Sequence, residues 1–208
     1  MSQPFDRGAT LCAPGEIDKS TGEFWSENPW SIAGRHNLSF YERNRTFLNV
    51  RGKDFLEISH LTGADTNGDS RCVVAADLNH DGRLDLVVRQ VGGGPLMLYE
   101  NRFKPRHYLR VSLRGHQSNR LGIGARLIAT IGQQRLFRDL LPVNSFRSQA
   151  PAIVHFGLGD AEKIDRLEIR WPSGKVQIFT NLAADRHVVL DEDSQHVETV
   201  QPGRTIRP

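Results

Sequence analysis

Residues 77–85 have the sequence Asp77-Leu78-Asn79-His80-Asp81-Gly82-Arg83-Leu84-Asp85. Three carboxylates this close together repel one another unless a positive group lies between them. Ca²⁺ binds about six to eight oxygens from carboxylates, amides and backbone carbonyls. Oxygens at every second position can lie on one side of a tight loop, and the glycine allows a sharp turn. We therefore predict a Ca²⁺ site formed by the side chains of Asp77, Asn79, Asp81 and Asp85 and the carbonyl oxygen of Arg83.

The residues on both sides of this loop are apolar and β-branched, which is typical of strands. They are residues 72–76 before the loop and residues 84–88 after it. An EF-hand would need a glutamate on a helix at the twelfth position, which here is Val88 in a predicted strand. The cation would therefore join two strands. The alternative is a metal-free hairpin turn rich in Asp, Asn and Gly, which are turn residues in their own right.

A second acidic cluster, Asp65-Thr66-Asn67-Gly68-Asp69, has the same alternation of oxygen-bearing side chains. It lacks the glycine at the sixth position and the closing aspartate. We interpret this cluster as a turn and not as a second ligand loop.

The strand, loop and strand over residues 73–88 resemble an FG-GAP or VCBS-type repeat. Such repeats form the blades of β-propellers, and the family binds Ca²⁺ at this loop. The resemblance implies one propeller-blade-like, four-stranded unit at residues 40–101. Its strands are expected at residues 44–50, 54–59, 71–77 and 84–90, with 96–101 beginning the next one. One blade cannot close a propeller, so the unit is expected to pack on its neighbour, to self-associate or to belong to a longer propeller.

A single blade presents unpaired strand edges and an apolar face, which proteins in water normally cover. The candidates for that face are Val73, Val87, Leu96 and Leu98. Residues 1–39 are rich in Gly, Pro, Ser and Asn and show no sustained period, so we interpret them as an irregular lead-in. Trp25 and Trp30 in this segment would cover the apolar face as a lid, unless the chain self-associates.

Residues 102–193 show the clean alternation of half-buried strands, which predicts an antiparallel β-sandwich or barrel. The strands are expected at 107–114, 164–171, 175–180 and 187–190. The expected inward positions are Leu109, Val111, Leu113, Leu127, Leu167, Ile169, Trp171 and Val189. The side chains of Arg110, Ser112 and Arg114 are expected to point to solvent. Residues 194–208 are interpreted as a flexible tail.

Three motifs in this second module resemble the signature of the ASPIC/UnbV domain: residues 115–126, 155–159 and 170–176. In the cartilage acidic protein-like family this domain usually follows FG-GAP-like repeats. The resemblance implies a location outside the cell or in the cell envelope. Because no signal peptide is visible at the start of the sequence, the chain is expected either to stay in the cytosol or to lack its true N-terminus.

The polar residues of the first motif allow two interpretations. Ser118, Asn119, Arg120 and Arg126 either contact an anion or a glycan, or hold the loop together through local hydrogen bonds. His155, next to an apolar run, is interpreted as a hydrogen-bonded structural histidine. Gly122 and Gly124 lack the third glycine and the βαβ context of a dinucleotide-binding fingerprint.

Composition narrows the function classes. The 208 residues carry a net charge of +3, divided between −4 for residues 1–101 and +7 for residues 102–208. No apolar run reaches the length of a membrane span. Cys12 and Cys72 either form one disulfide or are two free thiols. The arginines are not interleaved with aromatic platforms, which disfavours nucleic acid.

No catalytic constellation is visible, so we expect a calcium-binding, non-enzymatic binding or adhesion module with a protein or glycan ligand. The alternative is an enzyme or accessory protein of a biosynthetic pathway.

Overall fold

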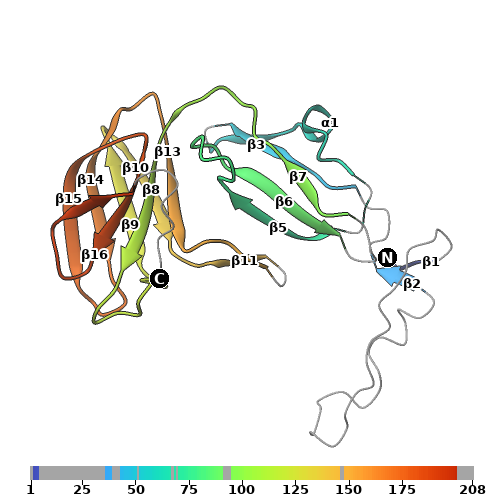
Figure 1. Ribbon diagram of the computed structural model, residues 1–208. Helices are drawn as coiled ribbons and strands as arrows, with labels where there is room; N and C mark the ends of the chain where they lie inside the picture. Colours follow the sequence, from blue (N-terminus) through green and yellow to red (C-terminus); the bar gives the residue numbers. More distant parts are fainter. Residues whose placement is uncertain are drawn as a thin grey trace, which may run out of the picture. The chain divides into compact units, whose positions relative to one another are not determined.

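The computed structural model (Figure 1) describes residues 2–4, 36–38, 43–50, 52–66, 68, 70–90, 95–145 and 148–200. The regular structure is nearly all β, as the alternating pattern predicts, and no sheet closes into a barrel. The chain divides into two compact units. The first comprises Met1–Val73 and Val87–Tyr99, and the second comprises Val74–Leu86 and Glu100–Pro208. The predicted cation loop therefore belongs to the same unit as the C-terminal β domain.

The second unit contains two four-stranded sheets (Figure 1). One has the order β10 (Gln134–Asp139), β9 (Arg126–Ile131), β14 (Lys163–Arg170) and β15 (Val176–Ala183). The other has the order β13 (Ile153–Gly159), β8 (His107–Arg114), β16 (Arg186–Asp191) and β17 (Val197–Thr199). All neighbours are antiparallel except β16 and β8, which are parallel. The short strands β11 (Val143–Ser145) and β12 (Ser148–Gln149) pair with each other.

One apolar core lies between these two sheets, because strands of both contribute buried side chains to a single cluster. It includes Leu109, Val111, Leu113, Leu127, Ala129, Val154, Phe156, Leu167, Ile169, Trp171, Phe179, Val188 and Leu190. The predicted inward positions are confirmed with one exception. Val188 and Leu190 face the core, whereas Val189 lies between them on the opposite face of the sheet.

The side chains on the other face of β8 are less exposed to solvent than the alternation predicts. Arg110 is mostly buried against Asp77, and Ser112 is buried beside His187. The expectation that both side chains point to solvent was wrong, because Asp77 of the loop contacts Arg110 and the side chain of His187 on the neighbouring strand β16 contacts Ser112.

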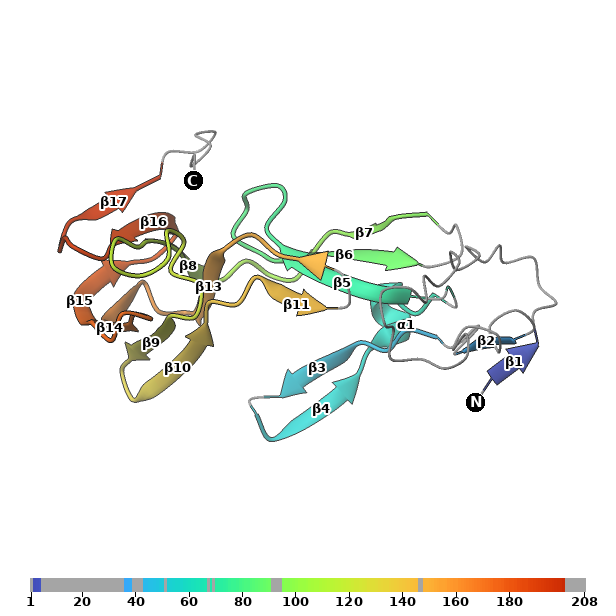
Figure 2. The same ribbon diagram turned by 90° about the horizontal axis from the view of Figure 1, so that it is seen from below.

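The expected four-stranded unit at residues 40–101 is instead divided between two sheets. β3 (Phe47–Val50) and β4 (Asp54–Glu57) form a hairpin, which Figure 2 shows. The strands β5 (Ser70–Ala76), β6 (Asp85–Gln90) and β7 (Met97–Tyr99) form a three-stranded sheet in that order. The strand expected to reach residue 59 ends at Glu57, because the helix α1 (Ser59–Thr62) begins two residues later. Gly63, in the left-handed conformation, caps the C-terminal end of this helix.

Three of the four residues expected on an apolar face are exposed: Val73, Leu96 and Leu98, whereas Val87 is half-buried. Among residues 1–39, the structure describes only the backbone of β1 (Ser2–Pro4) and β2 (His36–Leu38), which pair with each other. The expected lid with Trp25 and Trp30 lies outside the described residues, as does Cys12. Self-association stays a prediction. The tail expected to be flexible contains β17, which pairs with β16.

Candidate functional site

The loop between β5 and β6 is held by side chains that accept hydrogen bonds from its own backbone. Asp77 accepts from the N–H of Asp81 through Oδ1 (3.1 Å) and from the N–H of Gly82 through Oδ2 (3.2 Å). Asn79 Oδ1 also accepts from the N–H of Asp81 (3.1 Å), and Asp81 Oδ1 accepts from the N–H of Arg83 (2.9 Å). Each oxygen has two lone pairs, so Oδ1 of Asp77 and Oδ1 of Asp81, which accept one such bond each, keep a second lone pair for another ligand.

Asp85, the first residue of β6, closes the loop. Its side chain is almost fully buried, at 2% exposed. Its Oδ2 accepts from the N–H of Leu78 (3.1 Å) and its Oδ1 from the N–H of Asn101 (2.8 Å). Within the described residues no Lys, Arg or His side chain forms an ion pair with this carboxylate. A buried charge of this kind is stabilised only by the two N–H groups and by whatever cation lies nearby.

The other two carboxylates have arginine partners. Arg110 on β8 donates to Oδ2 of Asp77 at 2.9 Å, and both side chains are largely buried. Arg83 pairs with Asp81 within the loop. Burial raises the pKa of Asp81, but hydrogen bonds from Arg83 and Asn79 outweigh it and hold that pKa below its usual value. Two guanidinium groups therefore face three carboxylates, which leaves the loop with a net negative charge.

The loop is fastened to the β domain at Gly82. Its carbonyl oxygen accepts from Nε2 of His155 on β13 at 2.8 Å. Burial lowers the pKa of His155, which favours the neutral ring that donates this bond. The ring of His155 also stacks on Tyr108, with ring centroids 5.9 Å apart. His155 is thus a hydrogen-bonded structural histidine, as the sequence predicts.

Gly82 is required for two reasons. It has a positive φ of 85°, and a Cβ there would lie 2.0 Å from Cε1 of Tyr108. Gly82→Ala should therefore be destabilising, and Gly174→Ala is a matched control because Gly174 has a φ of 89° with open space around it. We expect Gly82→Ala to lower the free energy of unfolding by about 1–3 kcal/mol more than Gly174→Ala in urea titrations. Equal losses would show that the ring of Tyr108 does not pack on the loop.

The donor set of the loop fits a hard cation, since it consists of carboxylate, amide and carbonyl oxygens. Asp77, Asn79 and Asp81 meet around residue 81, where Asn79 Nδ2 also donates to Asp81 Oδ2 (2.9 Å), while Asp85 binds the N–H of Leu78. In the part of the chain that the structure describes, no three His, Cys, Asp or Glu side chains form a ready-made metal cluster. Convergence of all five predicted ligands on one cation stays a prediction. The second acidic cluster lies partly outside the described residues, at Asn67 and Asp69.

Sequence reasoning missed a buried carboxylate at the other end of the domain. Glu192 is 0% exposed. Its Oε2 accepts from the N–H groups of His116, Gln117 and Ser118 at 2.6, 2.9 and 2.9 Å. Its Oε1 accepts from the hydroxyls of Ser118 (2.8 Å) and Ser173 (2.6 Å). Five donors thus bind one carboxylate, which joins the loop after β8, the turn after β14 and the end of β16.

The polar residues of the first motif were expected either to contact an anion or a glycan or to hold the loop together. For three of the four, the structure shows hydrogen bonds within the domain. Ser118 binds Glu192, and Asn119 bonds both the N–H and the carbonyl of Ile123 (2.8 and 2.7 Å). Arg126 forms two hydrogen bonds with Asp139 (2.7 and 2.9 Å). These three side chains serve loop and sheet architecture.

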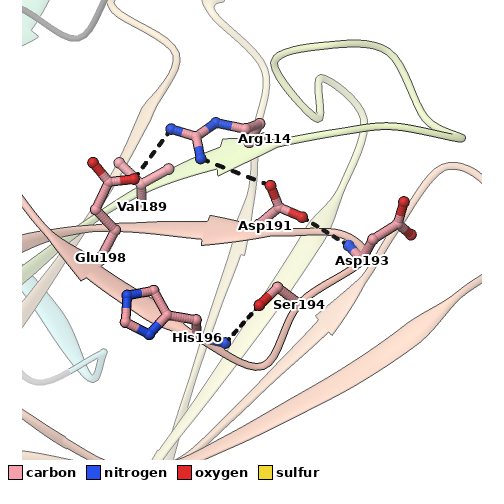
Figure 3. A pocket seen from close by; sticks show the side chains of 7 residues that line it. All are labelled: Arg114, Val189, Asp191, Asp193, Ser194, His196 and Glu198. Atoms are coloured by element: carbon pink, nitrogen blue, oxygen red, sulfur yellow. Dashed lines mark hydrogen bonds and ion pairs between the residues drawn. The ribbon is translucent and has the colours of Figure 1, made fainter.

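A cavity of about 190 Å³ lies on the outer face of β16 and β17, and its lining residues are shown in Figure 3. Arg114 lies between Glu198 (3.2 Å) and Asp191 (3.7 Å). His116 also pairs with Asp191 (2.9 Å), and Lys175 pairs with Asp193 (3.4 Å). The acids of this cavity are thus already paired with basic groups. Val189, expected in the core, lines this cavity instead.

Ser112 and His187 form a second pair that the sequence did not suggest. The hydroxyl oxygen lies 2.8 Å from Nε2 of the ring. Burial and the nearby charges of Arg110 and His80 lower the pKa of His187 to about 4, so the ring is neutral at neutral pH. Among the described residues no carboxylate binds its Nδ1, so the pair lacks the orienting member of a catalytic triad.

Comparison with known proteins places one family on this domain. Residues 115–197 match the family described as ASPIC and UnbV. The match runs from the loop that binds Glu192 into β17, and it confirms the resemblance of the second module. No curated protein matches the chain. The FG-GAP or VCBS resemblance of residues 40–101 stays a prediction. No helix among the described residues is long and apolar enough to cross a membrane.

Proposed function

We propose that the chain is a calcium-binding, non-enzymatic binding or adhesion module that works outside the cell or in the cell envelope, with a protein or glycan ligand. The observation that carries the proposal is the buried carboxylate of Asp85, which has no ion-pair partner among the described residues. It closes a nine-residue loop with two further aspartates and one asparagine. Ca²⁺ bound in the loop would supply the missing positive charge.

The position of the loop supports a role for the cation beyond local stability. Arg110 and His155 attach the loop to two neighbouring strands, β8 and β13, of the β domain. A cation that orders Asp77 and the backbone around Gly82 would therefore also order this face of the sheet. Ligand binding by the domain would then depend on Ca²⁺.

The paired state of the acid and base groups supports a binding role over catalysis. A general base must be free to accept a proton, yet Asp191, Glu198 and Glu168 have basic partners. Ser112 is buried on a regular strand and bonded to a neutral histidine. The alternative function is an enzyme or accessory protein of a biosynthetic pathway.

Ca²⁺ is expected to stabilise the folded chain. Binding to the native state alone adds about 2.7 kcal/mol to the free energy of unfolding at a concentration one hundred times Kd. Urea titrations in EDTA and at a series of CaCl₂ concentrations measure this increment, and a fit of its logarithmic dependence on CaCl₂ gives Kd. A Kd of about 10⁻⁴–10⁻³ M is expected, because modules outside the cell meet abundant Ca²⁺.

Asp81→Asn is expected to remove most of this increment, because it deletes one ligand charge and keeps the hydrogen bond to the N–H of Arg83. Asp160→Asn is the matched control, since its side chain is 88% exposed and lies outside the loop. Identical stability in CaCl₂ and EDTA for the unmodified chain would refute the calcium part of the proposal. An equal loss of the increment in both variants would refute the assignment to this loop.

A further inference from the structure

The outer face of the sheet β10-β9-β14-β15 has an ordered pattern of side chains, which follows from the register of its strands. Three rows cross the sheet from β10 to β15. The first row holds Asp139, Arg126, Arg170 and Val176, the middle row holds Phe137, Ile128, Glu168 and Ile178, and the third row holds Arg135, Thr130, Arg166 and Thr180. We call these twelve residues the arginine face.

The middle row is apolar at both ends and open to solvent there. Phe137 is 52% exposed and Ile178 is 44% exposed, and Val176 beside them is 55% exposed. Ile128 between them is buried, although it lies outside the main core. An exposed aromatic ring and two aliphatic side chains on a flat sheet are an apolar surface of the kind that binding sites use.

The two outer rows are rich in positive charge. Three of the four arginines share two carboxylates: Asp139 pairs with Arg126, and Glu168 pairs with both Arg166 and Arg170. The guanidinium group of Arg135 lies over the ring of Phe137 at 5.3 Å, so among the described residues its partner is a ring and not a carboxylate. The face therefore keeps a net charge of +2.

Arg126 and Arg170 are direct cross-strand partners in this register. Like charges opposite each other destabilise a sheet, and the carboxylates of Asp139 and Glu168 lower this repulsion. An anionic partner bound over the face would relieve this repulsion. Arginine and aromatic residues also dominate the binding energy of protein interfaces.

We propose that the arginine face docks an acidic amphipathic helix of a partner protein, with apolar side chains on the middle row and carboxylates toward the arginines on both sides. This inference rests on the proposed function as a binding module and names its surface and the chemistry of its partner. The first and third rows lie four residues apart along each strand, or about 13 Å. A helix with its side chains is about 10–12 Å across, so it fits between them. The sheet is about 14 Å wide, which about ten helical residues span.

The observations favour a helix over a glycan or a nucleic acid. Sugars and bases stack on aromatic rings, and this face has one ring. The aliphatic side chains of Val176 and Ile178 instead call for apolar side chains in the partner. Guanidinium groups bind carboxylates through bidentate hydrogen bonds. Glutamates on both sides of the apolar stripe of a helix would supply such carboxylates.

The test uses the full chain and a fluorescent fourteen-residue helical peptide that carries Leu and Phe on one stripe and Glu on both flanks. The comparison peptides are a version with Gln for Glu and a scramble of the same composition. Fluorescence anisotropy should show at least about tenfold tighter binding of the patterned peptide than of either comparison peptide. Arg135→Gln and Phe137→Ser should each weaken binding about tenfold or more. Arg102→Gln removes an exposed arginine outside the face and should leave the affinity within about twofold.

Equal binding of the scramble would overturn the inference, because it would show attraction by charge alone. Absence of binding at about 1 mM peptide, a Kd that corresponds to only about −4.1 kcal/mol, would overturn it as well. So would tighter binding of dextran sulfate with the same sensitivity to Arg135→Gln, because the ligand would then be a polyanion. Each titration is repeated in CaCl₂ and in EDTA. Patterned binding without any effect of Ca²⁺ would contradict the proposed dependence of ligand binding on Ca²⁺ and leave this inference standing.

Discussion

Glu192→Ala is expected to lower the free energy of unfolding by about 3–5 kcal/mol, since an unpaired buried donor costs about 1–3 kcal/mol. The substitution leaves three backbone N–H groups and two serine hydroxyls without their acceptor. The loop after β8, the turn after β14 and the end of β16 all lose the same anchor. Glu192→Gln keeps the shape of the side chain and replaces one acceptor oxygen with a donor, so it separates the role of the charge from that of the volume.

The same carboxylate makes stability depend on pH. Burial raises the pKa of Glu192, but hydrogen bonds from Ser173, Ser118 and His116 outweigh it and lower the pKa from 4.5 to about 2. The folded state therefore protonates Glu192 at a lower pH than the unfolded state. Its contribution is complete above pH 4.5 and is lost as the pH falls from 4.5 toward 2.

Urea titrations of the unmodified chain and of Glu192→Gln, at steps between pH 7 and pH 3, measure this dependence. The difference between the two should be constant above pH 4.5 and should shrink below it. Asp193→Asn is the matched control, because this neighbouring acid is half-exposed and pairs with Lys175. A difference that does not change with pH would contradict the assigned role of the charge.

Trp171→Ala is expected to cost about 3–5 kcal/mol, as is usual when a large aromatic side chain is removed from a core. The side chain is 3% exposed and belongs to the core between the two sheets. Its Nε1 donates to Oε1 of Gln177 at 2.6 Å. Gln177 in turn donates to the carbonyl oxygens of Asp191 (3.1 Å) and Ser194 (3.1 Å). The indole thus supports both the core and the segment that carries Glu192.

Trp171→Phe separates these two contributions. It keeps most of the apolar volume but leaves Gln177 Oε1 without its donor, which should cost about 1–3 kcal/mol. Phe103→Ala, at a position 60% exposed in the same unit, should change stability by no more than about 0.5 kcal/mol. A loss for Trp171→Phe as large as that for Trp171→Ala would show that the hydrogen bond, and not the packing, holds this region.

Much of the β domain could be predicted from the sequence because its strands alternate cleanly. Residues 107–114 form a strand with Leu109, Val111 and Leu113 inward, as expected. The failure at Val189 has a local reason. Residues 188–190 are all apolar and all buried, so the pattern does not say which of them face the core. The register of β16 against β8 decides which of these side chains face the core, and the sequence pattern of β16 does not contain that register.

The residues that surround the candidate site were harder to find, because their partners lie far away in the sequence. Glu192 stands in the acidic run 191–193 at the predicted end of the domain, and its donors are 74–76 residues earlier in the chain at 116–118. Arg110 looked solvent-facing, and its partner Asp77 is 33 residues away. A loop between two strands at this place could be predicted, because its turn residues lie within nine positions between two apolar runs, whereas its role as a cation site stays a prediction. The four-stranded unit around it could not, because α1 interrupts the expected strand and β3 and β4 pair with each other.

A crystal structure of the full chain grown in CaCl₂, with anomalous difference density measured at a long X-ray wavelength, tests the calcium site most directly. We predict one peak about 2.3–2.6 Å from side-chain oxygens of Asp77, Asn79, Asp81 and Asp85 and from the carbonyl oxygen of Arg83. The peak should be absent from crystals of Asp81→Asn. A loop without a peak, with these oxygens more than about 6 Å from any common centre, would show a metal-free turn neutralised by Arg83 and Arg110 and would contradict the proposal.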